Sequence, residues 1–372
     1  MAPRVLFWLA TLVPIYCYLG YPLALIILAR FIRREVRKRP FEPLVTLLIP
    51  AYNEARSIRQ KIVNSLALDY PAERLEIVVA CDGSTDATPS LAQSFADGTR
   101  VRVLSFPDNR GKMATLNAAM PGLGGEIVVF SDATAMLERG SLRRLLENFA
   151  DPSVGAASGV YKVLQAENAN IGTSEDFYWR YETLLKIQES RLASTLGAHG
   201  HLHAIRKSLY PYPPEATIND DYVIPTSVIG RGYRAVYEPA AVVYEEAREM
   251  TGFGRRVRIM AGNIQQLREL RGLLSPPRPL ELFFFFSHKI CRLLVPFAML
   301  VALAANTALA DQSPYGSLLF AQLAFYGLAL CGLVWRLRPK LLMLPYYFSM
   351  INAAAFFGVY HSLTRRRGMA WK

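Results

Sequence analysis

Three short apolar runs, each followed by an acid or a turn, constrain most strongly how this chain of 372 residues can fold. The runs cover residues 45–49, 77–81 and 127–130, and Asp82 and Asp132 follow the second and third. Apolar runs of this length, bounded by turn residues, predict buried β-strands. Because an open α/β sheet presents ligand groups at the carboxyl ends of its strands, the sequence predicts one ligand site that includes both acids.

Helical stretches alternate with these runs between residue 40 and about residue 250. They are placed by helical periodicity and by glycine or proline stops. They cover residues 56–67, 88–97, 112–120, 141–150 and 175–193. Strands and helices alternating at this spacing predict an α/β domain with a Rossmann-like, mostly parallel sheet.

A membrane portion explains why 52% of the residues are hydrophobic and the mean hydropathy is +0.17. Residues 5–29 carry no charge, and such a run is long enough to cross a bilayer core of roughly 30 Å. A basic stretch, residues 30–39, follows it. This order favours a retained anchor over a cleaved signal peptide, with the basic flank and the α/β domain on the cytoplasmic side of the inner membrane.

Three further uncharged runs lie towards the carboxyl end, at residues 293–310, 312–335 and 341–360. Each is long enough, or nearly so, to span a bilayer. Four spans would place both chain ends outside, whereas the basic residues 365–367 argue for an inside end. We favour four spans, with one re-entrant or interfacial run as the alternative. Residues 251–274 mix arginines with apolar residues, which is typical of a helix on the membrane surface.

These features divide the chain into four predicted parts. They are an anchor with its basic linker at 1–39, the α/β domain at 40–250, an amphipathic interface region at 251–280 and a membrane region of about three spans at 281–372. The net charge of +12 lies largely beside the apolar runs, so anionic lipid headgroups explain it better than nucleic acid does. The four cysteines are scattered without a Cys-x-x-Cys spacing and predict neither disulfides nor a zinc site.

Four polar motifs accompany the predicted strands. They are Ile49-Pro-Ala-Tyr-Asn-Glu54, Asp82-Gly-Ser-Thr-Asp86, Asp108-Asn-Arg-Gly-Lys112 and Ser131-Asp-Ala-Thr134. Alone, each has a structural interpretation: residues 49–54 form a turn and a cap, Asp86 caps a helix, and Lys112 is a surface lysine. Together, two acids at strand ends and a lysine in a glycine turn before a helix suit a nucleoside diphosphate with a divalent cation.

In this order and spacing, residues 44–132 resemble the family 2 glycosyltransferases, inverting enzymes of the GT-A fold that use nucleotide sugars. The resemblance extends to about residue 262, and the flanking spans are similar to those of membrane-bound members that build envelope polysaccharides. It implies transfer of a sugar from a nucleoside diphosphate sugar, with a UDP sugar as the expected donor, to a lipid-linked or growing glycan. It also implies a bound Mg²⁺ or Mn²⁺, and it makes polysaccharide export proteins candidate partners.

The resemblance assigns the nucleotide pocket residue by residue. Pro50 and Tyr52, with the backbone around them, would shape the base, and Glu54 would face the ribose or the base edge. Asp82 would hydrogen bond uracil or an equivalent base. Lys112 would bind the phosphates at the start of a helix.

Asp132 is the predicted cation ligand. A carboxylate after an apolar strand needs a cation or several hydrogen bonds, because burying it unpaired is costly. The family commonly shows two acids separated by one residue, whereas this chain has Thr134 in the second place. One carboxylate, waters and the two donor phosphates can hold Mg²⁺. Because Thr134 supplies no second carboxylate, we do not expect tight metal binding when no donor is bound.

The segment Asn219-Asp-Asp-Tyr222 resembles the family's Glu-Asp pair, whose second acid is the general base. Inversion needs a carboxylate opposite the leaving diphosphate to take the proton of the acceptor hydroxyl. Asp221 is therefore the predicted base, and Asp220 would orient it or accept from the acceptor. The alternative is that both acids only cap the helix that begins near Tyr222.

Arg255-Arg-Val-Arg-Ile259 aligns with the Gln-x-x-Arg-Trp motif of processive synthases. Arg258 keeps its place and would neutralise the leaving diphosphate. Arg255 replaces the glutamine on the donor side, and Ile259 replaces the tryptophan that would stack on the acceptor sugar. This replacement weakens the case for a processive synthase, and a basic membrane-facing helix is the structural alternative.

Three histidines, His199, His201 and His203, alternate along one segment and would share one side of a strand. Three histidines at one place can bind zinc. The segment also resembles the glycine-rich acceptor segment of the family, where a histidine would hydrogen bond the acceptor sugar. Both interpretations remain open in the sequence.

Other classes of function compete with a transferase. A transporter needs ionisable residues inside its spans, and residues 312–335 and 341–360 have none. A noncatalytic nucleotide-sugar-binding membrane protein would keep Asp82 and Lys112 but would not need Asp221. Among enzymes, a processive polysaccharide synthase competes with a transferase that adds one sugar.

Overall fold

The computed structural model describes the chain apart from residues 165–171, 247–252, 275, 336–339 and 365–372. Its centre is a sheet of eight strands in the order β3-β2-β1-β4-β7-β6-β8-β5. The strands are β1 Val45–Ala51, β2 Leu75–Asp82, β3 Val101–Phe106, β4 Ile127–Phe130, β5 Met136–Leu137, β6 Val154–Leu164, β7 His203–Arg206 and β8 Arg234–Glu246. The three strands predicted from the apolar runs are β1, β2 and β4.

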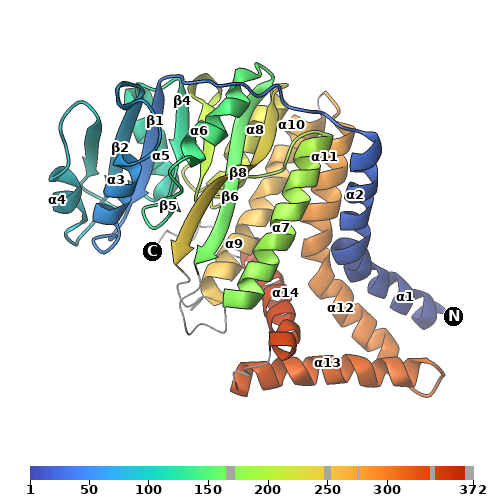
Figure 1. The fold of residues 1–372 in the computed structure, drawn as a ribbon. Coiled ribbons are helices and arrows are strands. Elements are labelled where there is room, and N and C mark those ends of the chain that lie inside the picture. The colour runs from blue at the N-terminus through green and yellow to red at the C-terminus, as the bar shows by residue number, and fades with distance from the viewer. Residues whose placement is uncertain (165–171, 247–252, 275, 336–339, 365–372) are drawn as a thin grey trace.

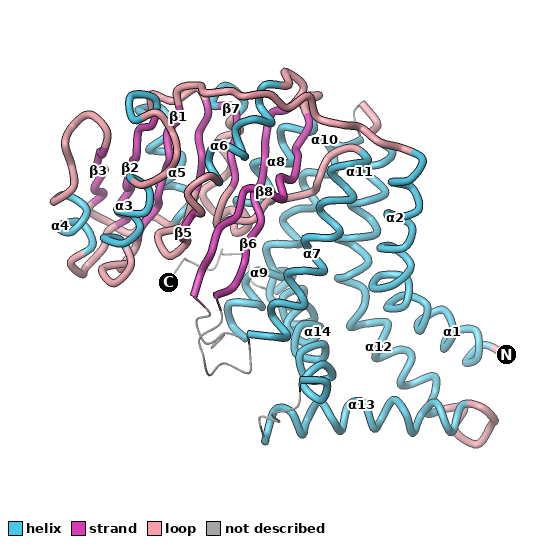
Figure 2. Tube along the Cα trace, viewed as in Figure 1, coloured by secondary structure: helices cyan, strands magenta, loops and turns pink. Residues whose placement is uncertain are grey.

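The described helices surround this sheet and extend away from it (Figures 1 and 2). They are α1 Ala2–Ile15, α2 Tyr21–Phe31, α3 Ile58–Leu66, α4 Thr88–Gln93, α5 Lys112–Ala119, α6 Ser141–Leu146, α7 Gly172–Leu192, α8 Asp220–Gly230, α9 Phe253–Gln265, α10 Leu270–Leu274, α11 Pro279–Phe284, α12 Cys291–Thr307, α13 Tyr315–Trp335 and α14 Lys340–Thr364. The five helices predicted from periodicity are α3 to α7. The largest differences are at two carboxyl ends, since α4 ends at Gln93 rather than at residue 97 and α6 gives way to a 3-10 turn at Glu147–Ala150.

The sheet is mixed, which refines the prediction of a mostly parallel one. Strands β3, β2, β1 and β4 are parallel, and β6 is parallel to β8. Strand β7 runs antiparallel to both of its neighbours, and β5 runs antiparallel to β8. The α/β class is confirmed. The parallel half carries the predicted strand-end acids, because all of its carboxyl ends lie along one edge.

Both faces of the sheet are buried, because side chains alternate along each strand. Leu47 and Ile49 belong to the core that α3 and α6 cover. Leu48 faces the opposite core, which contains residues of α5, α7 and α8. That second core also includes Tyr21 of α2 and Phe284 of α11. The helices that flank the domain in the sequence are therefore packed into its core.

Three described helical segments are long and apolar enough to cross a membrane: Ala2–Phe31, Pro279–Thr307 and Tyr315–Val334. They contain the predicted span at 5–29 and most of those at 293–310 and 312–335. Residues 308–310 of the second prediction and residues 312–314 and 335 of the third lie outside the candidate segments. The remaining predicted span, 341–360, lies within α14 and is not one of the three. Figure 1 shows α1, α12, α13 and α14 standing away from the sheet, with α7 and α9 closer to it.

The predicted basic linker is fastened to the α/β domain. Residues 32–44 run along the top of the sheet in Figure 1, between α2 and β1. The buried Arg234 guanidinium donates to the Arg34 carbonyl at 2.8 Å, and the Arg37 N–H donates to the Asp151 carboxylate at 3.1 Å. These bonds fix how α2 leaves the domain.

Candidate active site

The predicted nucleotide acid, Asp82, ends β2 and is fully buried. Its two carboxylate oxygens accept one hydrogen bond each, from the N–H groups of Arg110 and Gly111, both at 2.9 Å. Asp82 therefore closes the turn that leads into α5. Gly83 is required next to it, because its φ is +62° and a Cβ would lie 2.2 Å from the Asn109 nitrogen.

The predicted base-binding residues lie at the carboxyl end of β1 and just after it, at the same edge. Pro50 is buried in the strand, whereas Tyr52 and Glu54 are partly exposed. The Glu54 carboxylate accepts from the Ser57 hydroxyl at 2.7 Å. Asp86 accepts from the N–H of Thr88 at 2.9 Å in a turn just before α4, and also from the N–H of Ala55 at 3.1 Å, so it does more than close this turn.

Lys112 lies between two of the predicted acids. It is the first residue of α5, and its ammonium is 3.0 Å from Asp132 Oδ1 and 3.1 Å from Asp220 Oδ2. Burial alone would lower the pKa of Lys112, but the charges of Asp132 and Asp220 outweigh burial and hold the pKa above its usual value. Lys112 is therefore a permanent cation that joins β4 to α8, rather than the surface lysine of the structural alternative.

The predicted base, Asp221, lies in the first turn of α8. Burial and the adjacent charge of Asp220 raise the pKa of Asp221 from 3.8 to about 6, against the opposing charges of Lys112, Lys186 and Lys289. A carboxylate with this pKa is ionised at neutral pH and is basic enough to accept a proton during a reaction. Asp220 and Asp221 are the first two residues of α8, a position that the capping alternative also predicts.

Asp132 and Asp221 face the same small volume. A Cβ built on Gly200 would lie 3.8 Å from Asp132 Oδ2 and 3.7 Å from Asp221 Oδ2. Burial raises the pKa of Asp132, but Lys112 and His201 more than offset burial, so the net shift is downward. Three predicted residues, from the loop after β4, from α5 and from α8, thus converge, although they are far apart in the sequence.

A buried lysine that the motifs did not reveal supports the loop that carries Asp132. Lys61 of α3 is fully buried and donates to the Ser131 hydroxyl at 2.7 Å and to the Ala135 carbonyl. The Ser131 hydroxyl in turn donates to the His201 carbonyl at 2.8 Å. Desolvation lowers the pKa of Lys61 to about 7. Its only sequence signal is a lysine on the apolar face of a predicted helix.

Helix α9 packs next to the acid pair Asp220 and Asp221. The Asn219 amide, just before Asp220, donates to the Ile259 carbonyl at 3.2 Å and to Asn263 Oδ1 at 3.0 Å. Arg258 lies on this helix, and the side chain of Arg255 lies outside the described residues. The predicted surface helix thus contacts the domain directly beside the acids.

The three alternating histidines have separate partners. His199 Nε2 is 2.9 Å from the Tyr237 hydroxyl, His201 Nε2 is 3.0 Å from Glu245, and the His203 ring stacks on Phe130 at 4.7 Å. Among the described residues there is no group of three or more His, Cys, Asp or Glu that could hold a metal ion. The zinc alternative therefore has no support in this geometry.

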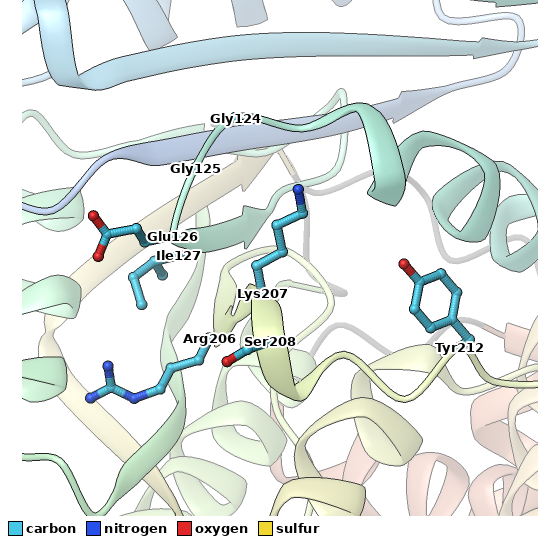
Figure 3. Close-up of a pocket in the computed structure, with 8 residues that line it drawn as sticks. All are labelled: Gly124, Gly125, Glu126, Ile127, Arg206, Lys207, Ser208 and Tyr212. Carbon is cyan, nitrogen blue, oxygen red and sulfur yellow. The ribbon is translucent and has the colours of Figure 1, made fainter.

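A hollow of about 540 Å³ lies elsewhere (Figure 3). It is lined by Gly124, Gly125, Glu126, Ile127, Arg206, Lys207, Ser208 and Tyr212. These residues surround the amino end of β4, whereas Asp132 follows its carboxyl end. The Arg206 guanidinium is already bonded to the Val154 carbonyl at 2.8 Å. The hollow is therefore distinct from the site at the acids.

Comparison with known proteins agrees with this geometry. Residues 46–211 match the family model for glycosyl transferase family 2. The chain is 27% identical over 271 residues to the poly-beta-1,6-N-acetyl-D-glucosamine synthase of Staphylococcus aureus (strain COL), covering 69% of this chain and 65% of that protein. It is also 27% identical, over 264 residues, to the probable glycosyltransferase YdaM of Bacillus subtilis (strain 168), covering 66% of this chain and 62% of YdaM.

A solved structure extends the similarity beyond the matched domain. The mannosyltransferase PcManGT from Pyrobaculum calidifontis, in complex with GDP-Man and Mn²⁺, superposes with a TM-score of 0.76 at 26% identity. The alignment covers 97% of this chain and all of that chain. The chain therefore carries a glycosyltransferase family 2 domain with a GT-A-like fold, as its motifs predicted. It is related to polysaccharide synthases, and it spans 65% of the length of the staphylococcal enzyme.

Proposed function

We propose that this protein transfers a sugar, with inversion, from a nucleoside diphosphate sugar to a hydroxyl of a lipid-linked or growing glycan. The observation that carries the proposal is the convergence of Asp132 and Asp221 on one volume beside Lys112. One acid is then placed for the diphosphate end of a donor and the other for the incoming hydroxyl.

The proposed reaction is a single in-line displacement. The acceptor oxygen attacks the anomeric carbon, its proton passes to the Asp221 carboxylate, and the bond between the anomeric carbon and the diphosphate oxygen breaks. Lys112 supplies positive charge where the diphosphate gains negative charge. We assign Arg258 the same role from α9, with Arg255 on the donor side. Asp220 holds Lys112 and orients its neighbour Asp221.

The residues around Asp132 fit a divalent cation that is shared with the donor. Its Oδ1 accepts from Lys112, and no hydrogen bond within the described chain engages Oδ2, which faces the Gly200 volume. Since these residues include no three-residue metal group, donor phosphates and water must complete the coordination of Mg²⁺ or Mn²⁺. When bound, such a cation neutralises charge on the diphosphate. The Mn²⁺ in the PcManGT complex supports this assignment.

The base of the donor is proposed to lie at the ends of β1 and β2, near Pro50, Tyr52, Glu54 and Asp82. Both oxygens of Asp82 already accept backbone N–H groups, but a carboxylate oxygen has a second lone pair for a base. We propose a UDP sugar. The GDP-Man in the PcManGT complex makes a guanine nucleotide the direct alternative.

We further propose that the catalytic domain lies on the cytoplasmic side of the inner membrane. The basic residues 30–39 directly follow the first candidate span, and positive flanks favour the cytoplasm. The division into parts 1–39, 40–250, 251–280 and 281–372 belongs to the same proposal. An acceptor anchored in the membrane would then approach from the side of α9 and α14.

Donor turnover by the purified full-length protein in detergent tests the proposal. UDP and GDP sugars are each incubated with Mn²⁺ or Mg²⁺, and released nucleotide and product size are measured. We expect turnover of one donor that requires the cation and disappears in Asp221→Asn. Full turnover by Asp221→Asn would refute the assigned base. Product length separates single addition from processive synthesis, which the name of the staphylococcal relative favours and Ile259 disfavours.

A further inference from the structure

The residue that replaces the second acid of the family pattern is hydrogen bonded to an acid from another strand. The Thr134 hydroxyl donates to Glu245 Oε1 at 2.5 Å. Strand pairing explains the meeting, because β5 runs antiparallel to β8 with Met136 opposite Tyr244. Glu245 follows Tyr244 in β8, so it lies beside the residues that precede Met136, and these include Thr134.

The other oxygen of Glu245 orients a histidine next to the same loop. Glu245 Oε2 lies 3.0 Å from His201 Nε2 and accepts from the Tyr161 hydroxyl at 3.4 Å. The Tyr161 and His201 rings stack at 4.2 Å. His201 directly follows Gly200, which marks the volume shared by the catalytic acids. Glu245 therefore contacts two side chains next to the site directly, Thr134 in the loop after Asp132 and His201 beside Gly200.

Asp132 and Glu245 also interact electrostatically with each other and with the buried ammonium group of Lys61. Burial works to raise the pKa of Glu245, and the charge of Asp132 adds to that effect, but His201 and Thr134 outweigh both, so the net shift is downward. The charges of both acids raise the pKa of Lys61, which burial lowers. The loop from residue 131 to 135 thus carries one acid, Asp132, and is hydrogen bonded through Thr134 to a second acid, Glu245, that comes from β8.

We propose that Glu245 is the second acid of the cation and diphosphate end of this site, relocated from position 134 to β8. The inference rests on the proposed function, because it assumes that Asp132 holds a divalent cation shared with the donor. Both oxygens of Glu245 are bonded to protein groups, so Glu245 is a positioning residue. It contributes negative charge and holds Thr134 and His201, which in turn fix the Asp132 loop. Partners of this kind typically change metal affinity by about 10- to 100-fold when they are removed.

A charge swap tests the relocation. Glu245→Gln removes the charge, and the double variant Thr134→Asp with Glu245→Gln moves it to the family position at the same net charge. The swap also keeps a hydrogen bond with its direction reversed, since the glutamine amide donates to the new aspartate. The measurement is the free Mn²⁺ signal in electron paramagnetic resonance, titrated with full-length protein and UDP or GDP.

We expect Glu245→Gln to weaken Mn²⁺ binding about tenfold and the double variant to return to within about threefold of the wild type. Unchanged binding by Glu245→Gln, or a double variant as weak as the single one, would overturn the proposal. Glu138→Gln is the matched control, because Glu138 is an exposed acid just beyond β5, and it should bind normally. Thermal melting shows whether each variant is folded.

Two more variants separate the possible failures. Thr134→Val removes only the hydroxyl donor, so it provides a test if Glu245→Gln does not fold. It should weaken Mn²⁺ binding by about threefold, less than Glu245→Gln does, because only one hydrogen bond to the Asp132 loop is lost and the charge of Glu245 remains. No weakening counts against the relocation. Asp132→Asn should abolish binding in every background. If Asp132→Asn binds normally, the proposed function loses its cation ligand, irrespective of Glu245.

Discussion

Replacing the proposed base should make the protein inactive and more stable at the same time. In the folded chain, burial and Asp220 raise the pKa of Asp221 from 3.8 to about 6. Well below pH 3.8 the group is protonated in both the folded and unfolded states and contributes nothing. As the pH rises, the unfolded chain ionises first, so a cost to folding grows until about pH 6 and is constant above it. Asp221→Asn removes that cost.

The size of the effect follows from the shift. Each pKa unit corresponds to about 1.4 kcal/mol, so the raised pKa of Asp221 costs at most about 3 kcal/mol at pH 7.5. Because the side chain is only partly buried, solvent screening reduces our expectation to about 2 kcal/mol. A gain of this size raises the melting temperature of a domain of this length by about 5 °C. Loss of the base should lower kcat by about 10²- to 10⁴-fold.

Thermal melting of both proteins in detergent at pH 4.5, 6 and 7.5, with turnover measured in parallel, checks this prediction. The stability difference should be large at pH 7.5 and small at pH 4.5, whereas the loss of activity should persist at every pH where the wild type works. A variant that is inactive but less stable at pH 7.5 would show that Asp221 is held by favourable interactions. The reasoning from burial and like charge would then be wrong.

Four further substitutions address neighbouring groups. Asp220→Asn should move the acidic limb of the kcat/KM profile to lower pH, because the charge of Asp220 raises the pKa of Asp221; a pH series that does not shift contradicts this. Lys112→Met should raise the donor KM at least about tenfold through loss of a charge-assisted contact, as measured by nucleotide release. Asp82→Asn leaves one backbone N–H facing an amide N–H and should cost about 2 kcal/mol, seen as a lower melting temperature with native-like kcat. Gly83→Ala should impair donor binding more than Asp82→Asn does, because of its positive φ and close backbone contact; isothermal titration with nucleoside diphosphate compares the two.

Much of the parallel half of the fold follows from local patterns. Strands β1, β2 and β4 are apolar runs bounded by turns, and Asp82 and Asp132 follow them directly. Parallel strands end at one edge, so the meeting of these two acids with the helix that begins at Lys112 could be predicted. The antiparallel strand β7 could not be predicted in the same way. It is only four residues long, and the histidines in and before it suggested metal or acceptor binding instead.

The contacts that complete the site depend on residues far apart in the sequence. Lys61 meets Ser131 only because α3 packs against β5 and the loop that joins β4 to β5. Glu245 meets Thr134 only because β5 pairs with β8. Neither contact leaves a local pattern, since a single lysine or glutamate is most often solvated.

The sequence by itself determined the family, the strand-end acids and the apolar segments, because each of these depends on neighbouring residues and on their spacing. Only the tertiary structure decided that Lys112 joins Asp132 to Asp220, that Asp132 and Asp221 share one volume, and that a second acid arrives from β8. The physical reason is that charge interactions act through space over a few ångströms, and which charges come that close is fixed by sheet order and register rather than by position along the chain.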